Sequence, residues 1–131
     1  MRDIWFRGKR KDNGEWVYGY YEKYNGGSYI NLQTDRLNSG GYPIREFVEV
    51  IPETVGQYTG LTDKKGNKIF EGDIVKWNIN FAIVWQDCKF VIKKDINAKP
   101  YDYVLSCFNG TELKVIGNIH DNPELLKGGA E

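Results

Sequence analysis

The residues best suited to chemistry are three carboxylates, Asp63, Glu71 and Asp73, that lie close together in the sequence. Carboxylate oxygens are the ligands that hard divalent cations prefer, and a bound cation can activate water for hydrolysis. Their spacing differs from that of a calcium-binding loop, and three lysines in the same segment offset their charge. The segment is therefore predicted to be structural, with a metal-assisted hydrolase as a minor alternative.

Backbone requirements explain the same segment without a ligand. Gly60 and Gly66 are predicted to occupy turn positions where the chain needs the positive φ that glycine adopts readily. Glu71, Gly72 and Asp73 are predicted to form a sharp turn that leads into a strand. We therefore predict no catalytic residue, no metal ligand and no cofactor.

The sequence has only two cysteines and one histidine that could support thiol or imidazole chemistry. Cys88, Cys107 and His120 are one ligand short of a tetrahedral zinc set, and the two-residue spacings of a zinc ribbon are absent. A Cys–His nucleophile pair is formally possible. The interpretation we favour is that Cys107 is a small buried residue and that His120 lies in a loop before a terminal helix. The sequence has neither the Gly-x-Ser-x-Gly nor the Gly-Lys-Ser/Thr signature.

A basic arm near the N-terminus is the clearest electrostatic feature. Its members are Trp5, Arg7, Lys9, Arg10 and Lys11. Alternate side chains of a strand share a face, so all of them except Arg10 would form one surface able to stack a nucleobase and follow a phosphate backbone. Lys93 and Lys94 would extend this surface. The alternative is a charged edge strand whose lysines discourage further pairing, with Trp5 in the core.

Length and composition limit the class of protein. The 131 residues predict one domain, and 40% apolar with 27% charged residues is typical of a folded chain. With 18 Lys and Arg against 18 Asp and Glu, there is no global field to attract nucleic acid. The longest apolar run, 81–85, is far shorter than a membrane span, and the first residues lack a secretory h-region. We therefore expect no membrane contact, a cytoplasmic location and reduced cysteines.

The pattern along the chain predicts a mainly-β fold. Aromatic residues make up 15% and the chain has 15 glycines, so short strands alternate with turns. Asn13-Gly14 predicts a type I′ hairpin within residues 4–21, and residues 33–43 are predicted to be a mobile loop. Residues 121–126 predict a short helix, with Pro123 at its first position. Further strands are predicted at 28–32, 47–51, 55–61, 74–77, 81–86, 90–93, 101–107 and 113–119, with a hairpin turn at 109–110 joining the last two.

Three segments resemble the YopX family of phage and prophage proteins. They read MRDIWFR at 1–7, GQYTGLTDKKGNKIFEGDIV at 56–75 and VIGNIHDNPELL at 115–126. The resemblance implies a mainly-β protein whose second half is an SH3-type roll. Together with the pattern of strands and turns, we expect a small, partly open barrel with an N-terminal β-hairpin and one short C-terminal helix. Residues 1–131 would form one domain, with an N-terminal region at 1–51 and a barrel core at 54–126. The family supplies no assigned activity or site residues.

These observations lead to an expected function without catalysis. We expect a small interaction module of phage or prophage origin that binds a host or phage protein in the bacterial cytoplasm. A nucleic-acid-binding accessory protein that uses the basic arm is the alternative. A homo-oligomer is also expected, because the aromatic content exceeds what one small core needs.

Overall fold

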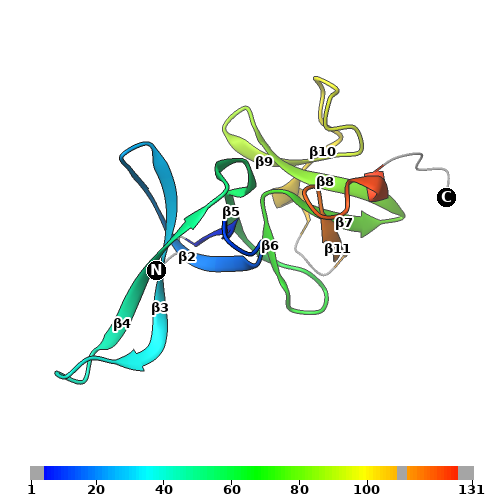
Figure 1. Ribbon diagram of the computed structural model, residues 1–131. Coiled ribbons are helices and arrows are strands. Elements are labelled where there is room, and N and C mark those ends of the chain that lie inside the picture. The colour runs from blue at the N-terminus through cyan, green and yellow to red at the C-terminus, as the bar shows by residue number, and fades with distance from the viewer. Residues whose placement is uncertain (1–4, 109–111, 127–131) are drawn as a thin grey trace. The chain divides into compact units, whose positions relative to one another are not determined.

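The structure is a computed structural model that describes residues 5–108 and 112–126 (Figure 1). The described residues confirm a mainly-β protein built of two antiparallel sheets. The sheets are not closed into a barrel, so the expected barrel is wrong, and the SH3-type roll is not confirmed. The strands are β1 (Phe6–Lys9), β2 (Trp16–Tyr24), β3 (Gly27–Leu37), β4 (Pro43–Val50), β5 (Gly56–Thr62), β6 (Lys68–Phe70), β7 (Asp73–Trp77), β8 (Ile79–Gln86), β9 (Lys89–Lys93), β10 (Tyr103–Val104) and β11 (Lys114–Asn118).

Helical structure is limited to single 3₁₀ turns in the described part of the chain. They are η1 (Pro52–Thr54), η2 (Leu105–Cys107) and η3 (Pro123–Leu126). None of them has the length or the apolar character needed to cross a membrane. In place of the predicted C-terminal helix the structure has only η3, a single 3₁₀ turn that begins at Pro123. Leu125 and Leu126 in this turn are half-buried.

The chain divides into two compact units, residues 1–57 and 58–131, which we call the first and the second unit. In the first unit the strand order is β4-β3-β2-β1, and the first two residues of β5 pair with β1. The second unit contains the rest of β5, which pairs with β6, and a five-stranded sheet in the order β10-β9-β8-β7-β11.

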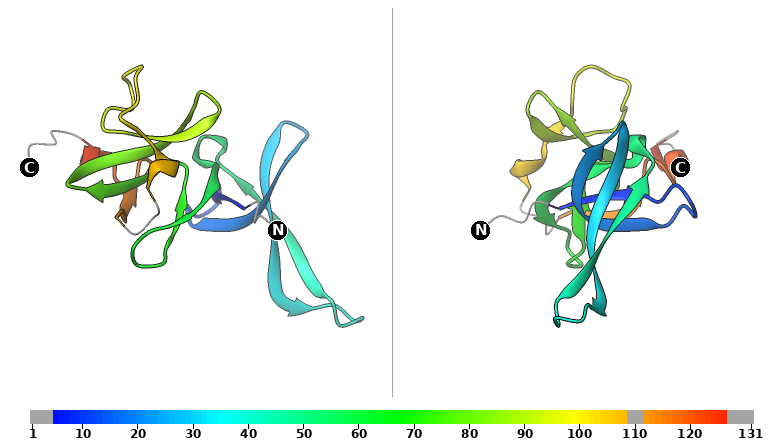
Figure 2. Two further views of the ribbon diagram at one scale, coloured as in Figure 1. Left: turned by 180° about the vertical axis from the view of Figure 1, so that it is seen from behind. Right: turned by 60° about the vertical axis from the view of Figure 1, so that its left-hand side comes forward.

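A long twisted hairpin, β3 and β4, dominates the first unit (Figures 1 and 2). The predicted loop at 33–43 is therefore mostly strand, because pairing continues to Leu37 opposite Pro43 and leaves 38–42 as the loop. The Thr34 hydroxyl donates a hydrogen bond to the Ile44 carbonyl at 2.7 Å and helps to hold this irregular end together. Loop-forming residue types were outweighed here by pairing with a partner strand.

The predicted hairpin between β1 and β2 is confirmed, but its turn type is wrong. Gly14 has φ +77° while Asn13 is not at positive φ, and the loop closes through the Arg10 amide to the Glu15 carbonyl at 2.8 Å. The Asn13 side chain accepts the Glu15 amide at 2.9 Å, a local bond that favours an Asx-type turn. Two successive positive φ values, as in type I′, occur instead at 25–26 and at 87–88.

The core of the second unit lies against its five-stranded sheet. Its buried members are Ile69, Val75, Phe81, Ile83, Ile92, Leu105, Phe108 and Leu113. The strand predicted at 101–107 is reduced to β10 followed by η2, and it pairs with β9. β11 pairs with β7 at the other edge of the sheet, so the expected hairpin between the last two strands is not formed. The turn predicted at 109–110 lies outside the described residues.

Replacing Gly66 should cost more stability than replacing the lysine beside it. Gly66 has φ +87°, and a β-branched residue there is strained by roughly 1–2 kcal/mol, whereas an exposed lysine contributes little. Thermal melts should therefore show a lower Tm for Gly66→Val than for Lys65→Ala. Equal melting temperatures would mean that the turn tolerates either side chain and that the φ argument is wrong.

Candidate functional site

An exposed aromatic surface covers one side of the sheet in the first unit. Side chains directly opposite one another on paired strands share a side, and Tyr20 pairs with Asn31, which pairs with Phe47. Tyr20 is 56% exposed and Phe47 is 58% exposed. The opposite side carries the buried residues Ile30, Val48 and Val50. We call this surface the aromatic face; its members are Trp5, Tyr18, Tyr20, Arg45 and Phe47.

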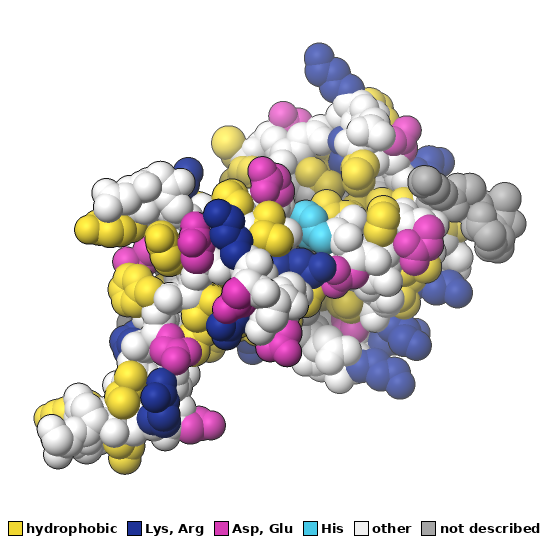
Figure 3. All heavy atoms as spheres, in the orientation of Figure 1, with side chains coloured by type: hydrophobic (Ala, Val, Ile, Leu, Met, Phe, Trp, Pro, Cys, Tyr) yellow, Lys and Arg dark blue, Asp and Glu magenta, His cyan; other side chains and the backbone are white. Residues whose placement is uncertain are grey.

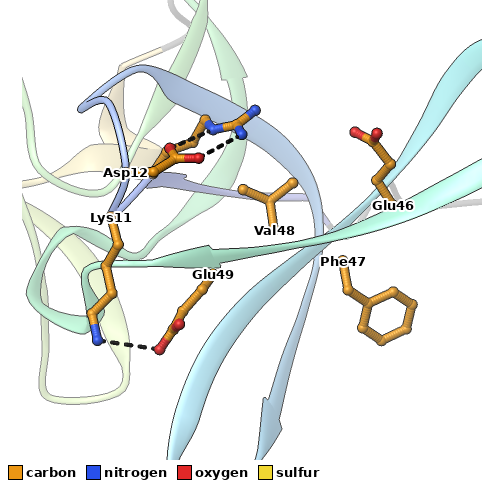
Figure 4. A pocket seen from close by; sticks show the side chains of 7 residues that line it. Lys11, Asp12, Glu46, Phe47, Val48 and Glu49 are labelled. Carbon is orange, nitrogen blue, oxygen red and sulfur yellow. Dashed lines mark hydrogen bonds and ion pairs between the residues drawn. The ribbon is translucent and has the colours of Figure 1, made fainter.

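Figure 4 shows this alternation along β4. Phe47 and Glu49 point to one side of the strand, and Glu46 and Val48 point to the other. In Figure 3, hydrophobic side chains are visible along the β2–β3 and β3–β4 hairpins, and Lys and Arg side chains are interspersed there with Asp and Glu. The aromatic face is thus a direct result of the period of two in β2, β3 and β4.

Arg45 is held in place on the aromatic face by neutral groups. Its Nε donates to the Asn31 Oδ1 at 2.7 Å, and its guanidinium lies 5.7 Å from the centre of the Tyr20 ring. Asn31 in turn donates from its side-chain nitrogen to Glu22 at 3.0 Å. Within the described residues, Arg45 has no ion pair within 4.0 Å. A positioned guanidinium is therefore available to a carboxylate from outside.

A shallow pocket of about 270 Å³ lies on the aromatic face. Aromatic side chains form part of its wall, and amide and guanidinium groups supply hydrogen-bond donors. Among the described residues that line it there is neither a thiol nor an imidazole. Its lining residues include Trp5, Tyr18, Tyr20, Asn31, Gln33 and Arg45. This set is suited to binding through stacking and hydrogen bonds rather than to covalent chemistry.

The basic arm does not form the single surface predicted for it. Arg7 is buried, with its guanidinium 4.7 Å from the centre of the Trp16 ring. The ammonium of Lys9 lies 5.8 Å from the same ring. β1 pairs with β2 on one side and with β5 on the other, so the edge-strand alternative is also wrong. Trp5, expected in the core under that alternative, is 37% exposed.

The remaining cations of the arm are paired within the first unit. Arg10 donates two hydrogen bonds of 2.9 Å to Asp12, and they hold the pKa of that carboxyl below its usual value. Lys11 forms an ion pair with Glu49 at 3.1 Å (Figure 4). A phosphate backbone would have to displace these carboxylates.

Lys93 and Lys94 are not an extension of a basic surface. Lys93 is 4% exposed, and its ammonium donates to the Gln86 side chain at 2.9 Å and to the Ala98 carbonyl. The backbone amide of Lys94 donates to Asp102. Lys93 therefore fastens the segment after β9 and is covered by it.

Asp63 is a structural anchor. It is 4% exposed and accepts backbone hydrogen bonds from Lys65 at 2.9 Å, Asn67 at 2.8 Å and Val115 at 2.9 Å. Burial by itself would raise the pKa of Asp63, but the bonds from Val115, Asn67 and Lys65 outweigh it and lower the pKa. The carboxylate thereby joins the turn after β5 to the start of β11.

The other two carboxylates do not join Asp63 in a metal site. Asp73 is buried and accepts the Phe70 amide at 2.7 Å, and Glu71 is half-buried in the turn before it. In the described ranges, no three His, Cys, Asp or Glu side chains gather in a group able to hold a metal. The backbone amides that Asp63 and Asp73 accept support the interpretation of this segment as structural turns.

The three glycines of this segment all have positive φ. The values are +92° at Gly60, +87° at Gly66 and +93° at Gly72. Gly72 donates its amide to the Ile83 carbonyl and accepts the Ile119 amide, each at 2.8 Å. The turn therefore connects β7 to two other segments of the second unit.

Neither cysteine is a buried core residue. Cys107 is exposed at the end of η2, so the prediction that it is buried is wrong; Leu105, two residues earlier, occupies the core instead. Cys88 is exposed in the turn between β8 and β9, with φ +63°. His120 lies in a turn before η3, as predicted, and its backbone amide donates to Asn118.

Acid should destabilise the protein partly through Asp63. Because the folded pKa of Asp63 lies below its unfolded value, its contribution is complete above about pH 4 and is lost as the pH falls through the folded pKa. Urea midpoints measured from pH 7 to about pH 2.5 should fall more steeply for the wild type than for Asp63→Asn below about pH 4. If the urea midpoints of the wild type and of Asp63→Asn fell in parallel over that pH range, the lowered pKa of Asp63 would be contradicted.

Nucleic acid should bind weakly, if at all. If Lys9, Arg10 and Lys11 each contacted a phosphate, the slope of log K against log salt would be about −2 for single strands and about −2.7 for duplex DNA. Labelled single-stranded and duplex DNA titrated at two salt concentrations should give no steeper slope, and Arg10→Ala with Lys11→Ala should remove any binding. Tight, salt-resistant binding that survives both substitutions would overturn this expectation.

Reasoning from the sequence missed most of the aromatic face. It placed Trp5 in the basic arm and assigned no role to Tyr18, Tyr20, Arg45 or Phe47. The available signal was the alternation Trp-Val-Tyr-Gly-Tyr at 16–20, where every second residue is aromatic and the residue between the two tyrosines is glycine. That pattern puts the three rings on one side of a strand, but it does not say which side is exposed.

Comparison with known proteins identifies similar chains. A family model described as "YopX protein" matches residues 5–127. A solved structure, the crystal structure of protein EF1440 from Enterococcus faecalis, is similar with a TM-score of 0.60 and 23% sequence identity, over 97% of this chain and 100% of that one. At this identity the likeness concerns the fold alone. No curated protein matches the chain.

Proposed function

This chain belongs to the YopX family, and on that premise we propose that it is a non-catalytic interaction module that binds a host or phage protein. The proposal places it in the cytoplasm of a bacterium that carries the phage or prophage. It includes no cofactor and no catalytic residue.

The observation that carries the proposal is the aromatic face. Trp, Tyr and Arg are the residue types most enriched among those that dominate binding energy at protein interfaces. Tyr18, Tyr20 and Phe47 are each more than two-fifths exposed on one side of one sheet. Contiguous exposed apolar surface of this kind is typical of an interaction site.

Charge favours a protein partner over nucleic acid. Residues 1–57 contain eight Lys and Arg and eight Asp and Glu, so the first unit has no net charge. Arg10, Lys11 and Arg36 form ion pairs with carboxylates of the same unit. Few cations are left for counterion release, which is the main source of affinity for a phosphate backbone.

The test is a capture experiment with matched variants. Tagged wild type, a Tyr20→Ser/Phe47→Ser variant and a Tyr42→Ser control would be exposed to extracts of infected host cells, with and without nuclease. Tyr42 is 71% exposed at the tip of the β3–β4 hairpin and does not belong to the aromatic face. The proposal predicts a protein retained by wild type and by Tyr42→Ser, lost with the double variant and insensitive to nuclease.

Three outcomes would contradict the proposal. Loss of the captured protein after nuclease treatment would favour nucleic acid. If the Tyr20→Ser/Phe47→Ser variant captured the protein as well as the wild type did, the binding site would lie outside the aromatic face. Turnover of a small molecule by the purified protein would make it an enzyme. Light scattering of the purified wild type separately tests the expected homo-oligomer.

A further inference from the structure

We propose that, in the free protein, the aromatic face is covered by the aromatic face of a second copy in a two-fold symmetric dimer. Arg45 of each copy would form an ion pair with Glu22 of the other copy. This inference rests on the proposed function in one respect, because the host or phage protein and the second copy would use the same face and so exclude each other. It identifies what occupies the face when the other protein is absent.

Glu22 is the negatively charged counterpart of Arg45 on this side of the sheet. It lies two residues after Tyr20 on β2, so its side chain is on the same side as the aromatic face. It is exposed and accepts a hydrogen bond from the Asn31 side chain at 3.0 Å. Within the described residues, neither Glu22 nor Arg45 has an ion pair within 4.0 Å. Each copy therefore offers one cation and one anion to a molecule that covers this side.

The Asn31 side chain holds the two charged groups on opposite sides of itself. Its oxygen accepts the hydrogen bond from Arg45 at 2.7 Å, and its nitrogen donates to Glu22. Tyr20, Asn31 and Phe47 form one row across the three strands. Glu22 belongs to the next row toward one end of the strands, and Arg45 belongs to the next row toward the other end. Asn31 on β3 is thus the midpoint between the two charges.

This arrangement is complementary to itself under a two-fold rotation. When two sheets pack face to face, an axis between them that passes over Asn31, perpendicular to the line from Arg45 to Glu22, exchanges the two charges. Arg45 of each copy then lies opposite Glu22 of the other, and both ion pairs form together, as every contact of an isologous interface occurs twice. Because the two charges cancel within each copy, two identical faces do not repel each other. Charge complementarity therefore assigns the face to a second copy.

The aromatic rings supply the apolar part of this interface. Trp5, Tyr18, Tyr20 and Phe47 are between 37% and 58% exposed. A fully covered aromatic side chain buries about 150–250 Å², so the four rings would bury roughly 400 Å² per copy. A standard interface buries about 800 Å² per partner, and the polar groups around the rings would supply the rest. We therefore expect a reversible dimer whose dissociation constant responds to its ion pairs.

Sedimentation equilibrium of the purified full-length protein, from about 1 µM to about 300 µM, measures this dimer. Wild type, Arg45→Glu, Glu22→Arg and a Lys23→Glu control would be compared after their melting curves are shown to match. Lys23 is an exposed residue of β2 with its side chain on the other side of the sheet. Wild type and Lys23→Glu should dimerise equally. Each of the other two variants brings like charges together at both contacts and should raise the dissociation constant at least about tenfold.

Mixing Arg45→Glu with Glu22→Arg tests the symmetry of the contact. In a dimer that contains one copy of each variant, both contacts again join a cation to an anion. The equal mixture should therefore dimerise about as strongly as the wild type, although neither variant does so alone.

Neutral variants keep the test valid if a charge reversal lowers the melting temperature. Arg45→Gln and Glu22→Gln would then replace the two reversed variants. Their mixed dimer keeps one of the two ion pairs, whereas a dimer of either variant with itself keeps neither. The mixture should therefore associate more tightly than each variant alone.

Three results would overturn this inference. They are a wild type that stays monomeric over the whole concentration range, charge-reversed variants that dimerise as well as the wild type, and a mixture that associates no more tightly than its components. All three are measured on the purified protein alone. The proposed function is judged separately, by capture that depends on Tyr20 and Phe47, so the two failures are distinguishable.

Discussion

Replacing Asp63 with Ala is expected to lower the free energy of unfolding by about 3 kcal/mol or more. The carboxylate accepts amides from Lys65, Asn67 and Val115 in a site that is 4% exposed. Alanine would leave those part-buried amides without their acceptor. A fully buried donor left unsatisfied costs about 1–3 kcal/mol, so the three part-buried donors together account for a loss of about 3 kcal/mol. The connection between the turn at 63–67 and β11 would be lost with them.

Urea denaturation followed by circular dichroism measures this effect, with Asp95→Ala as the control. Asp95 also accepts an amide, from Asn97 at 2.9 Å, but it lies in an exposed loop where water can replace it. The control should change the free energy of unfolding by less than about 1 kcal/mol. Similar losses for both variants would show that the burial of Asp63 does not matter.

Replacing Gly19 with Ala should be the most damaging single-methyl addition in the first unit. A Cβ on Gly19 would lie 2.4 Å from the Asn31 carbonyl oxygen and 3.0 Å from its carbonyl carbon, so β3 would have to move. Backbone shifts caused by overpacking typically cost about 1–3 kcal/mol, occasionally more, so we expect a loss of about 3 kcal/mol. Because Asn31 also holds Arg45, the geometry of the aromatic face should change too.

The matched control for this prediction is Gly40→Ala. A Cβ there meets only exposed side chains, at 3.3 Å or more, and the position does not have a positive φ. Thermal melts should therefore show a large fall in Tm for Gly19→Ala and little change for Gly40→Ala. If Gly19→Ala had the same Tm as the wild type, β2 and β3 would adapt to an added methyl group more easily than the distances between Gly19 and Asn31 indicate.

The sequence by itself determined the class of the fold and most of its strands. Alternating aromatic and β-branched residues between glycine-containing turns are local signals, and they located β2, β5, β7, β8 and β9 to within a few residues. The positive φ values of Gly60 and Gly66 also follow from residue type and context. So does family membership, because the matching segments run along nearly the whole chain.

Only the tertiary structure decided which strands pair and which side of the first sheet is covered. β10 and β11 are neighbours in sequence, yet each pairs with a different strand, because burying Leu105 and Leu113 in one core outweighs forming a local hairpin. Arg7 carries a charge and sits in a basic run, but its place on a central strand against Trp16 buries it.

The candidate site depends on the same non-local pairings. Tyr20, Arg45 and Phe47 come from β2 and β4, and β3 holds them in register through Asn31. Asp63 finds its third amide in Val115, 52 residues away. Local propensity carries no information about such partners, since each contact becomes favourable only when the chain between its ends has been ordered by the rest of the fold.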